Sequence, residues 1–230
     1  MIQTFRDIEY SLKRSRRKTA TIYVERDGRV SVQVPESLTT EEIETLLHSK
    51  RRWIYRHLAE WEELNRQKSP REYVNGEGFL YLGRSYRLKL VPDCDPPLIL
   101  KGGYFCLSTT HKSPAFADAA FKELYRDKGN ARIRSRVEYF QTQMDVAPKS
   151  LRVMELKNRW GSCTPTGNLN FHWKCMMAPV SIIDYIVVHE LAHLIHHNHS
   201  QAFWSEVDKV IPDYLDRKEW LRVNGAGMDL

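Results

Sequence analysis

The sequence has no long apolar run. A helix needs about 20 consecutive apolar residues to cross a bilayer, and no stretch of these 230 residues approaches that length. The first residues, 1–14, also lack the apolar centre of a secretory signal peptide. We therefore expect a protein that has no membrane partner and resides in the cytoplasm.

Cysteine is scarce, and charge of one sign does not dominate. The four cysteines form no C-x-x-C pair, so we expect free, mostly buried thiols in a reducing compartment. The net charge of +6 permits anionic partners without requiring them. With 42% hydrophobic and 28% charged residues, the chain is an ordinary globular protein that is long enough for one large domain or two small ones.

The most informative stretch is the H-E-x-x-H pattern at 189–193, which follows an apolar run at 182–188. Residues four apart share one face of a helix, so His189 and His193 can direct their ring nitrogens at one point. Imidazole nitrogens at about 2.0–2.1 Å suit zinc. Glu190 would then lie beside the metal, where a general base for a metal-bound water is needed.

A catalytic zinc usually takes three protein ligands and leaves one position open. On a continued helix His197 would lie roughly 12 Å from His189, too far to share one ion. The chain must therefore leave the helix, and Asn198 is the expected stop because asparagine tolerates the left-handed conformation. We expect His199 to be the third ligand and Glu206 to be its first replacement. His196 and His197 are expected to face solvent or to surround the metal without binding it.

The rest of the chain predicts an α+β protein. Turn residues separate strand-like runs, and Asp27-Gly28 predicts a hairpin between residues 21–25 and 29–34. Thr39 and Glu42 are spaced as a capping box for a helix to about residue 65. Ser113-Pro114 opens a helical pattern that Gly129 interrupts, so one kinked helix and two helices both remain open. We expect a β-rich region with one long helix at 1–110 and a zincin-like catalytic domain at 111–230.

Five positive charges fall within residues 13–18. They are either a solvated strand face or a strip that binds anions. Successive strand residues point to opposite faces. Arg14 and Arg16 would then share one face, and Arg17 would take the other. The face that meets the substrate would bind phosphates if the substrate is a nucleotide.

Together these motifs resemble the YgjP-like zinc metallohydrolase family over nearly the whole chain. The resemblance is carried by N-R-W-G-S-C at 158–163, H-E-L-A-H at 189–193 and N-H-S-x-x-F-W at 198–204, with weaker support from R-S-R-R at 14–17 and Y-L-G-R-x-Y at 81–86. It implies a zincin-type catalytic half with His189, His193 and His199 on the metal and Glu190 as base. The chain departs from the family at His172, where an asparagine is expected.

The segment 158–163 is predicted to be a turn before a strand at 169–173. Two readings of its side chains stay open. Either Trp160 fills the core behind the metal and Arg159 forms an ion pair, or Arg159 stabilises negative charge that develops on the substrate.

These observations predict a zinc-dependent, metallopeptidase-like hydrolase in which Glu190 activates a metal-bound water. One alternative is a metal-dependent nucleoside-triphosphate pyrophosphatase, a role also attributed within the resembling family. Another is a nucleic-acid-binding protein with a structural metal, which the open coordination position argues against. We expect a peptide, a small molecule or a nucleoside triphosphate as substrate and not a nucleic acid. Histidine ligands suit Ni, Co and Fe as well as Zn.

Overall fold

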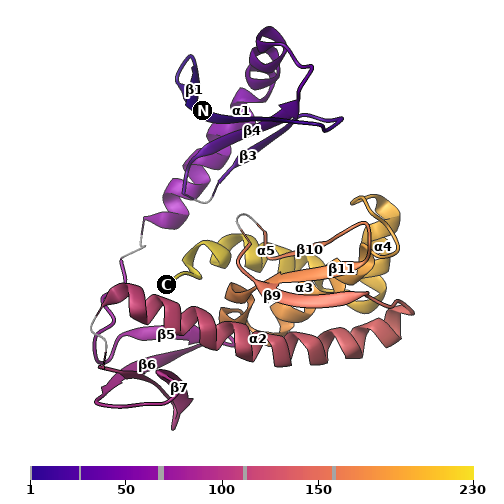
Figure 1. The fold of residues 1–230 in the computed structure, drawn as a ribbon. Coiled ribbons are helices and arrows are strands. Elements are labelled where there is room, and N and C mark those ends of the chain that lie inside the picture. The colour runs from indigo at the N-terminus through magenta and orange to yellow at the C-terminus, as the bar shows by residue number, and fades with distance from the viewer. Residues whose placement is uncertain (1, 26, 67–69, 111–112, 157–158) are drawn as a thin grey trace. The chain divides into compact units, whose positions relative to one another are not determined.

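The structure is a computed structural model that describes residues 2–25, 27–66, 70–110, 113–156 and 159–230. These residues form five α-helices and three β-sheets (Figure 1), which confirms the predicted α+β class. The chain divides into two compact units, Met1–Lys68 and Ser69–Leu230, and each has its own buried core. We call them unit 1 and unit 2.

Unit 1 is a four-stranded sheet covered by one long helix. Its elements are β1 (Ile2–Phe5), β2 (Ile8–Ser15), β3 (Thr21–Val24), β4 (Val30–Pro35) and α1 (Thr40–Asn65). The strand order is β1-β2-β4-β3, with β3 and β4 antiparallel as the predicted hairpin. The predicted capping box is present, since Thr39 N donates to Glu42 Oε2 over 2.8 Å and Glu42 N donates to Thr39 Oγ1 over 3.3 Å.

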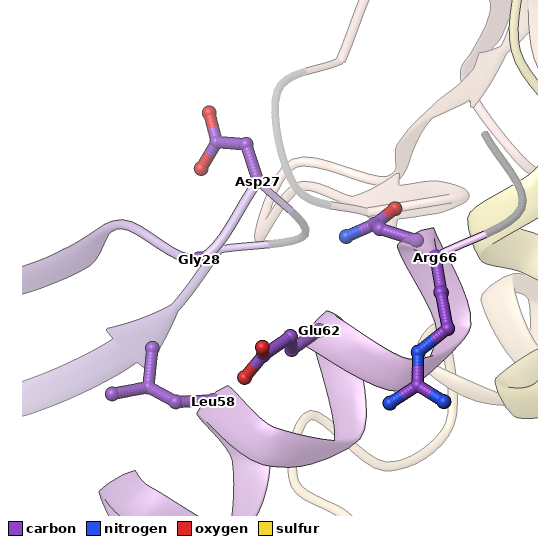
Figure 2. A pocket seen from close by; sticks show the side chains of 6 residues that line it. Asp27, Gly28, Leu58, Glu62 and Arg66 are labelled. Atoms are coloured by element: carbon purple, nitrogen blue, oxygen red, sulfur yellow. The ribbon is translucent and has the colours of Figure 1, made fainter. Parts of the chain in front are cut away.

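A shallow hollow lies between the β3–β4 turn and the last turns of α1 (Figure 2). Its lining consists of Asp27, Gly28, Leu58, Glu62, Asn65 and Arg66. Asp27 is held by an ion pair with Arg29 at 2.6 Å. None of the lining residues is a histidine or a cysteine, so the hollow does not offer the ligands that the sequence predicts for the metal.

Unit 2 contains two sheets and all the remaining helices that the structure describes. Its elements are β5 (Gly78–Tyr81), β6 (Arg84–Val91), β7 (Leu98–Lys101), β8 (Tyr104–Ser108), α2 (Pro114–Met144), β9 (Ser150–Met154), β10 (Gly161–Cys163), β11 (Asn168–His172), η1 (Trp173–Met177), α3 (Val180–Ala192), α4 (Gln201–Val210), α5 (Tyr214–Asn224) and η2 (Gly225–Gly227). The strand orders are β5-β6-β8-β7 and β10-β11-β9. The stretch 161–163 is thus a strand, although the sequence analysis expected a turn there.

The boundary between the units differs from the division at residues 110/111 that we expected. The sheet β5–β8 lies before residue 111 but shares its core with the helices that follow. The ring of Phe121 in α2 lies 4.2 Å from that of Phe79 and 5.1 Å from that of Phe105, between centroids. These long-range aromatic contacts place the strand-rich stretch in the same unit as the H-E-x-x-H helix.

The turn between β5 and β6 supports the start of α3. Leu82 and Gly83 have positive φ angles of 49° and 78°, and their amides donate to the carbonyls of Met176 and Met177. A Cβ atom on Gly83 would lie 2.8 Å from Cγ of Pro179, the residue just before α3. Residue 83 must therefore be glycine for two reasons: its φ angle is positive, and Pro179 lies too close for a side chain.

The helix α2 is continuous through Gly129, which resolves the question that the sequence left open. It contacts β7 of one sheet and β9 of the other (Figure 1). Gly129 is buried in this helix, and a Cβ atom there would lie 3.1 Å from Cγ1 of Val153 in β9. The glycine thus allows the helix to approach the strand closely and does not break it.

Two further expectations concern thiols and membranes. All four cysteines are free, but only Cys175 is buried, whereas Cys94, Cys106 and Cys163 are half-buried. This differs from the expected mostly buried thiols. None of the helices formed by the described residues combines the length and the apolar character that crossing a bilayer would take.

Candidate metal centre

The centre is built on the last turn of α3. Most of this helix is apolar and buried, and Ile186, Val187, Val188 and Leu191 are at most 3% exposed. Because the helix is packed on so much of its surface, the direction of its polar side chains is determined by the packing. His189 is half-buried near its end, and Glu190 is buried with 5% exposure.

The helix ends earlier than the sequence predicted. It stops at Ala192, with His193 as its C-cap, and not at Asn198. Two i→i−3 bonds, from Leu194 N to Leu191 O and from Ile195 N to Ala192 O, tighten the chain at this point. The His193 ring then donates from Nδ1 to the carbonyl of His196 over 3.1 Å. This bond caps the turn and leaves Nε2 of His193 free to bind a ligand.

The chain beyond the turn brings His199 back to the helix. Its Nε2 atom lies 3.0 Å from Nε2 of His189, and one ring nitrogen from each of His189, His193 and His199 lies within 4.8 Å of the others. Two imidazole ligands on a tetrahedral zinc would be separated by about 3.3 Å, given zinc–nitrogen distances of about 2.0–2.1 Å. The three predicted ligands are thus brought together in a geometry that fits a metal ion.

An aromatic floor holds the three imidazoles. The ring of Phe203 in α4 is fully buried, and its centroid lies 4.6–4.9 Å from those of all three histidines. Trp204 stacks on His199 at 5.7 Å and on Tyr214 at 5.3 Å. Phe203 and Trp204, the last two residues of the motif at 198–204, thus pack against the three histidines. Ser200 begins α4 by accepting from Phe203 N, which sets the direction of this helix.

Glu190 lies against strand β10. A Cβ atom built on Gly161 would lie 2.6 Å from both Cγ and Oε1 of Glu190, so only glycine leaves room for this side chain. Burial raises the pKa of Glu190 to about 8, while the charge of Arg159 and the backbone amide of Cys163 oppose the increase. Among the residues that the structure describes, Oε2 of Glu190 has no hydrogen-bond partner.

The histidines are held in the neutral form. Burial lowers the pKa of His189 to about 3, with further contributions from the charges of His193, His199 and Lys218. Burial likewise lowers the pKa values of His193 and His199. A neutral imidazole offers the lone pair that a metal needs. The electrostatics of the site therefore agree with its geometry.

The remaining histidines and Glu206 lie around the centre in other roles. His196 supplies the carbonyl that orients His193, and His197 is exposed. Glu206 pairs with Lys209 at 2.7 Å and is not part of the group of three.

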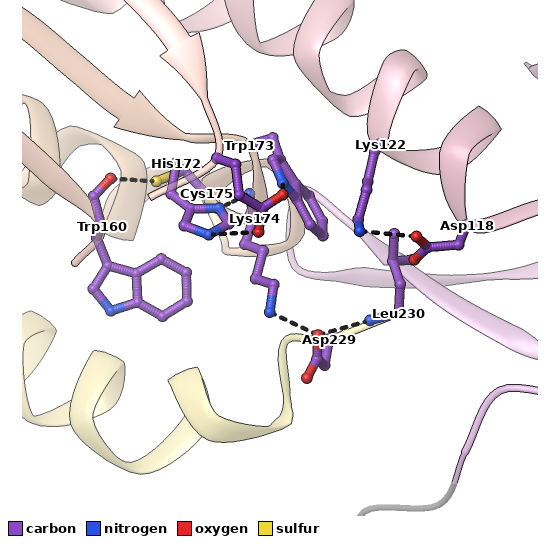
Figure 3. Close-up of polar contacts among 10 residues, drawn as sticks. Asp118, Lys122, Trp160, His172, Trp173, Lys174, Cys175, Asp229 and Leu230 are labelled. Carbon is purple, nitrogen blue, oxygen red and sulfur yellow. Dashed lines mark hydrogen bonds and ion pairs between the residues drawn. The ribbon is translucent and has the colours of Figure 1, made fainter. Parts of the chain in front are cut away.

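His172, the departure from the family pattern, is buried in a polar cluster of unit 2 (Figure 3). Its Nδ1 accepts from Lys174 N over 3.1 Å, so the side chain caps η1. Its Nε2 lies 3.7 Å from Glu155 Oε1. This gives His172 a structural role at the end of β11.

The structure bears on one of the two residues, Trp160 and Arg159, whose roles the sequence left open. A Cβ atom on Gly225 would lie 2.8 Å from Cζ2 of Trp160, so the indole packs closely on the C-terminal η2. This supports the structural reading of Trp160. Arg159 is exposed, and both readings of its side chain, an ion pair or the stabilisation of charge on the substrate, stay predictions. Asn158, the first residue of the motif, lies outside the described residues.

The basic strip lies in unit 1. Strand β2 ends at Ser15, so the predicted alternation does not extend to Arg16 and Arg17. Arg14 donates to the carbonyls of Leu38 and Glu36. Arg17 donates to Gln33 Oε1 over 2.9 Å and to Thr21 Oγ1 over 2.6 Å, whereas Arg16 is exposed. Phosphate binding by these arginines stays a prediction.

Sequence reasoning missed two neighbours of the site. One is Gly161, for which a glycine inside a strand was the available signal, since such a glycine often marks a close approach. The other is Lys218 of α5, whose ammonium lies 4.4 Å from the ring centre of Trp204. No local pattern distinguishes this lysine from any other on a helix surface.

Comparison with known proteins gives the family of the chain. No curated protein matches the chain significantly. Among solved structures, the metallopeptidase zymogen of Pyrococcus abyssi abylysin is similar at 23% identity and a TM-score of 0.37, over 39% of this chain and 90% of that one. The sequence profile described as "YgjP-like, metallopeptidase domain" matches residues 18–224. Because this match takes in most of unit 1 and nearly all of unit 2, the chain belongs to the YgjP-like metallopeptidase-domain family.

Proposed function

We propose that the protein is a zinc-dependent hydrolase that cleaves peptide bonds, with His189, His193 and His199 as metal ligands and Glu190 as general base. One observation carries the proposal. Three neutral imidazoles converge within 4.8 Å, and a buried carboxyl group with an unpartnered oxygen follows the first of them. When bound, zinc would lower the pKa of a water molecule and polarise the substrate carbonyl.

The residues around the metal would orient the ligands and transfer the proton. His193 is oriented by the His196 carbonyl, and His199 is held between Phe203 and Trp204. Glu190 takes the proton from the attacking water at Oε2 and returns it to the leaving amine. The carboxyl group must be ionised for this step. Its pKa of about 8 belongs to the site without a metal ion, and the positive charge of a bound zinc would lower it.

The size of the ligand group favours a catalytic metal over a structural one. Among the described residues, no fourth histidine, cysteine or carboxylate joins the three histidines. A structural zinc is usually closed by four protein ligands, whereas a catalytic zinc keeps an open position. The reading as a nucleic-acid-binding protein with a structural metal therefore has less support.

The pyrophosphatase alternative depends on arginines that would bind phosphates. The guanidinium groups of Arg14 and Arg17 are already hydrogen-bonded to other groups of unit 1, although Arg14 is exposed, as Arg16 is. This observation favours the peptide over the nucleotide, and a direct comparison of both substrate classes decides between them.

The test is a hydrolysis screen of the zinc-loaded protein against a peptide mixture and nucleoside triphosphates side by side. Glu190→Gln is the matched control, because glutamine has a similar shape but cannot take up the proton. We expect peptide cleavage that falls by about 10²–10⁴-fold in the variant, with equal zinc content by elemental analysis. Cleavage of triphosphates alone would establish the alternative. Equal turnover in a zinc-replete variant would remove Glu190 from the mechanism.

A further inference from the structure

The side chain of Glu190 occupies the space that a side chain at position 161 would need. Gly161 is buried in β10, where it pairs with Phe171 of β11. A Cβ atom there would lie 2.6 Å from Cγ, 2.6 Å from Oε1 and 2.8 Å from Cδ of Glu190. Separations below 3.0 Å are not tolerated between such atoms, so one of the two groups would have to move.

The group that moves is the glutamate. All three atoms that the added carbon would meet belong to the outer part of one flexible side chain, and none belongs to the backbone. Strand β10 is paired along its length with β11, and α3 is fixed by its buried apolar residues. A rotation of the Glu190 side chain therefore costs less than a shift of either element.

We propose that Gly161 is a positioning residue for Glu190: the bare backbone of β10 forms the wall against which the carboxyl group is set. This inference rests on the proposed function, because it assigns to Gly161 a role in placing the proposed general base. It predicts that a substitution at position 161 changes turnover without changing metal binding or folding. An added methyl group should spare the fold and the metal ligands while it displaces the carboxylate.

The turnover experiment uses Gly161→Ala in the full-length protein with the peptide substrate found in the screen. A misplacement of about 1 Å can cost about 100-fold in rate, so we expect kcat to fall by about that factor. KM and zinc content should stay near those of the unmodified protein. The control is Gly227→Ala, because a Cβ atom at Gly227 meets nothing within 4 Å and its φ angle is not positive. This control should behave as wild type.

A double-mutant cycle separates positioning from general damage. Gly161→Ala should cost nothing further in the residual turnover of Glu190→Ala, because the displaced side chain is already gone. Metal-free melting temperatures give a second readout that needs no substrate. The change in Tm caused by Gly161→Ala should differ by about 2–4 °C between the wild-type protein and the Glu190→Ala variant. The added methyl group should be less harmful in the variant, where the glutamate side chain no longer occupies the space.

The outcomes keep the two claims apart. Equal Tm effects in the two backgrounds, or full turnover by Gly161→Ala, would overturn the positioning role even if Glu190→Gln is inactive. A coupled Tm effect together with an active Glu190→Gln would uphold the contact and defeat the proposed general base. Loss of zinc from Gly161→Ala would show that residue 161 acts on the ligands, which also contradicts the proposal.

Discussion

At the scale of single residues, the centre keeps its titratable groups neutral near pH 7. Burial disfavours the charged form of each group, which moves histidine and glutamate pKa values in opposite directions. The pKa of His189 falls to about 3, and that of Glu190 rises to about 8. The site without metal therefore carries little charge, and its neutral histidines do not repel a cation.

The depressed pKa of His189 predicts that this residue lowers the stability of the metal-free protein as the pH falls. Below pH 6.5 the unfolded chain takes up a proton on this histidine, while the folded chain resists until about pH 3. The contribution of His189 to the free energy of unfolding should therefore decrease as the pH falls from 6.5 towards 3. Glu190 contributes the opposite slope between pH 4.5 and 8.

His189→Asn isolates the histidine contribution, because both proteins share Glu190. Urea unfolding of the metal-free proteins at pH 7.5, 6 and 5 should show a smaller acid-side loss of stability in the variant. Parallel pH profiles for the two proteins would contradict the low pKa of His189.

At the scale of elements, α3 is tied to its neighbours by charged contacts as well as by apolar packing. Arg136 of α2 contacts Asp184 with two bonds, Nε to Oδ1 at 2.6 Å and Nη2 to Oδ2 at 2.9 Å. Arg217 of α5 donates to the carbonyl of Ser181 over 2.9 Å. These contacts hold the first turns of the helix in place. The position of His189 and His193 at the other end of the helix follows from that of the whole helix.

Asp184→Asn should weaken the attachment of α3 to α2. The pair is only partly exposed, at 25% and 13% for the two side chains, so the loss should be that of a charged hydrogen-bonded contact, about 1.5–3 kcal/mol. Chemical denaturation gives the value. Asp118→Asn serves as the comparison, because its i,i+4 pair with Lys122 is of a kind that contributes about 0.3–0.5 kcal/mol. Equal losses from the two substitutions would rule out a special role for the Arg136 pair.

Local patterns predicted those elements whose signals lie within a few residues. The capping box at Thr39, the hairpin at Gly28 and the Ser113-Pro114 start all appear where the sequence indicated. The end of α3 was misplaced because the preference of Asn198 lost to the tighter turn capped by His193. The convergence of His189, His193 and His199 followed from spacing alone, since helix geometry excludes a straight continuation.

What the sequence could not predict depends on contacts between distant residues. The unit boundary follows from Gly83 on Pro179 and from Phe79 on Phe121. The environment of Glu190 follows from Gly161, which is far from it along the chain. Periodicity reports which face of an element is apolar, but it does not report which partner covers that face.

At the scale of the whole molecule, the two cores predict two unfolding transitions. All three candidate ligands belong to unit 2, so zinc should stabilise that unit alone. The gain is about 4 kcal/mol when free zinc is 1,000 times the dissociation constant. Scanning calorimetry with zinc and with a chelator should move one transition and leave the other in place. His193→Ala should abolish the shift, and a single transition that moves as a whole would contradict the independence of the units.

The early end of α3 has a consequence in the language of polymer loops. A metal shared by His189 and His199 would act as a cross-link that closes a loop of ten residues. Closing a free loop of that length costs about 2 kcal/mol in chain entropy. Here the fold itself brings the Nε2 atoms of these two histidines to 3.0 Å, beside the buried ring of Phe203. Because the packing of the chain closes this loop, the binding free energy of the ion would not be used to order the chain between His189 and His199.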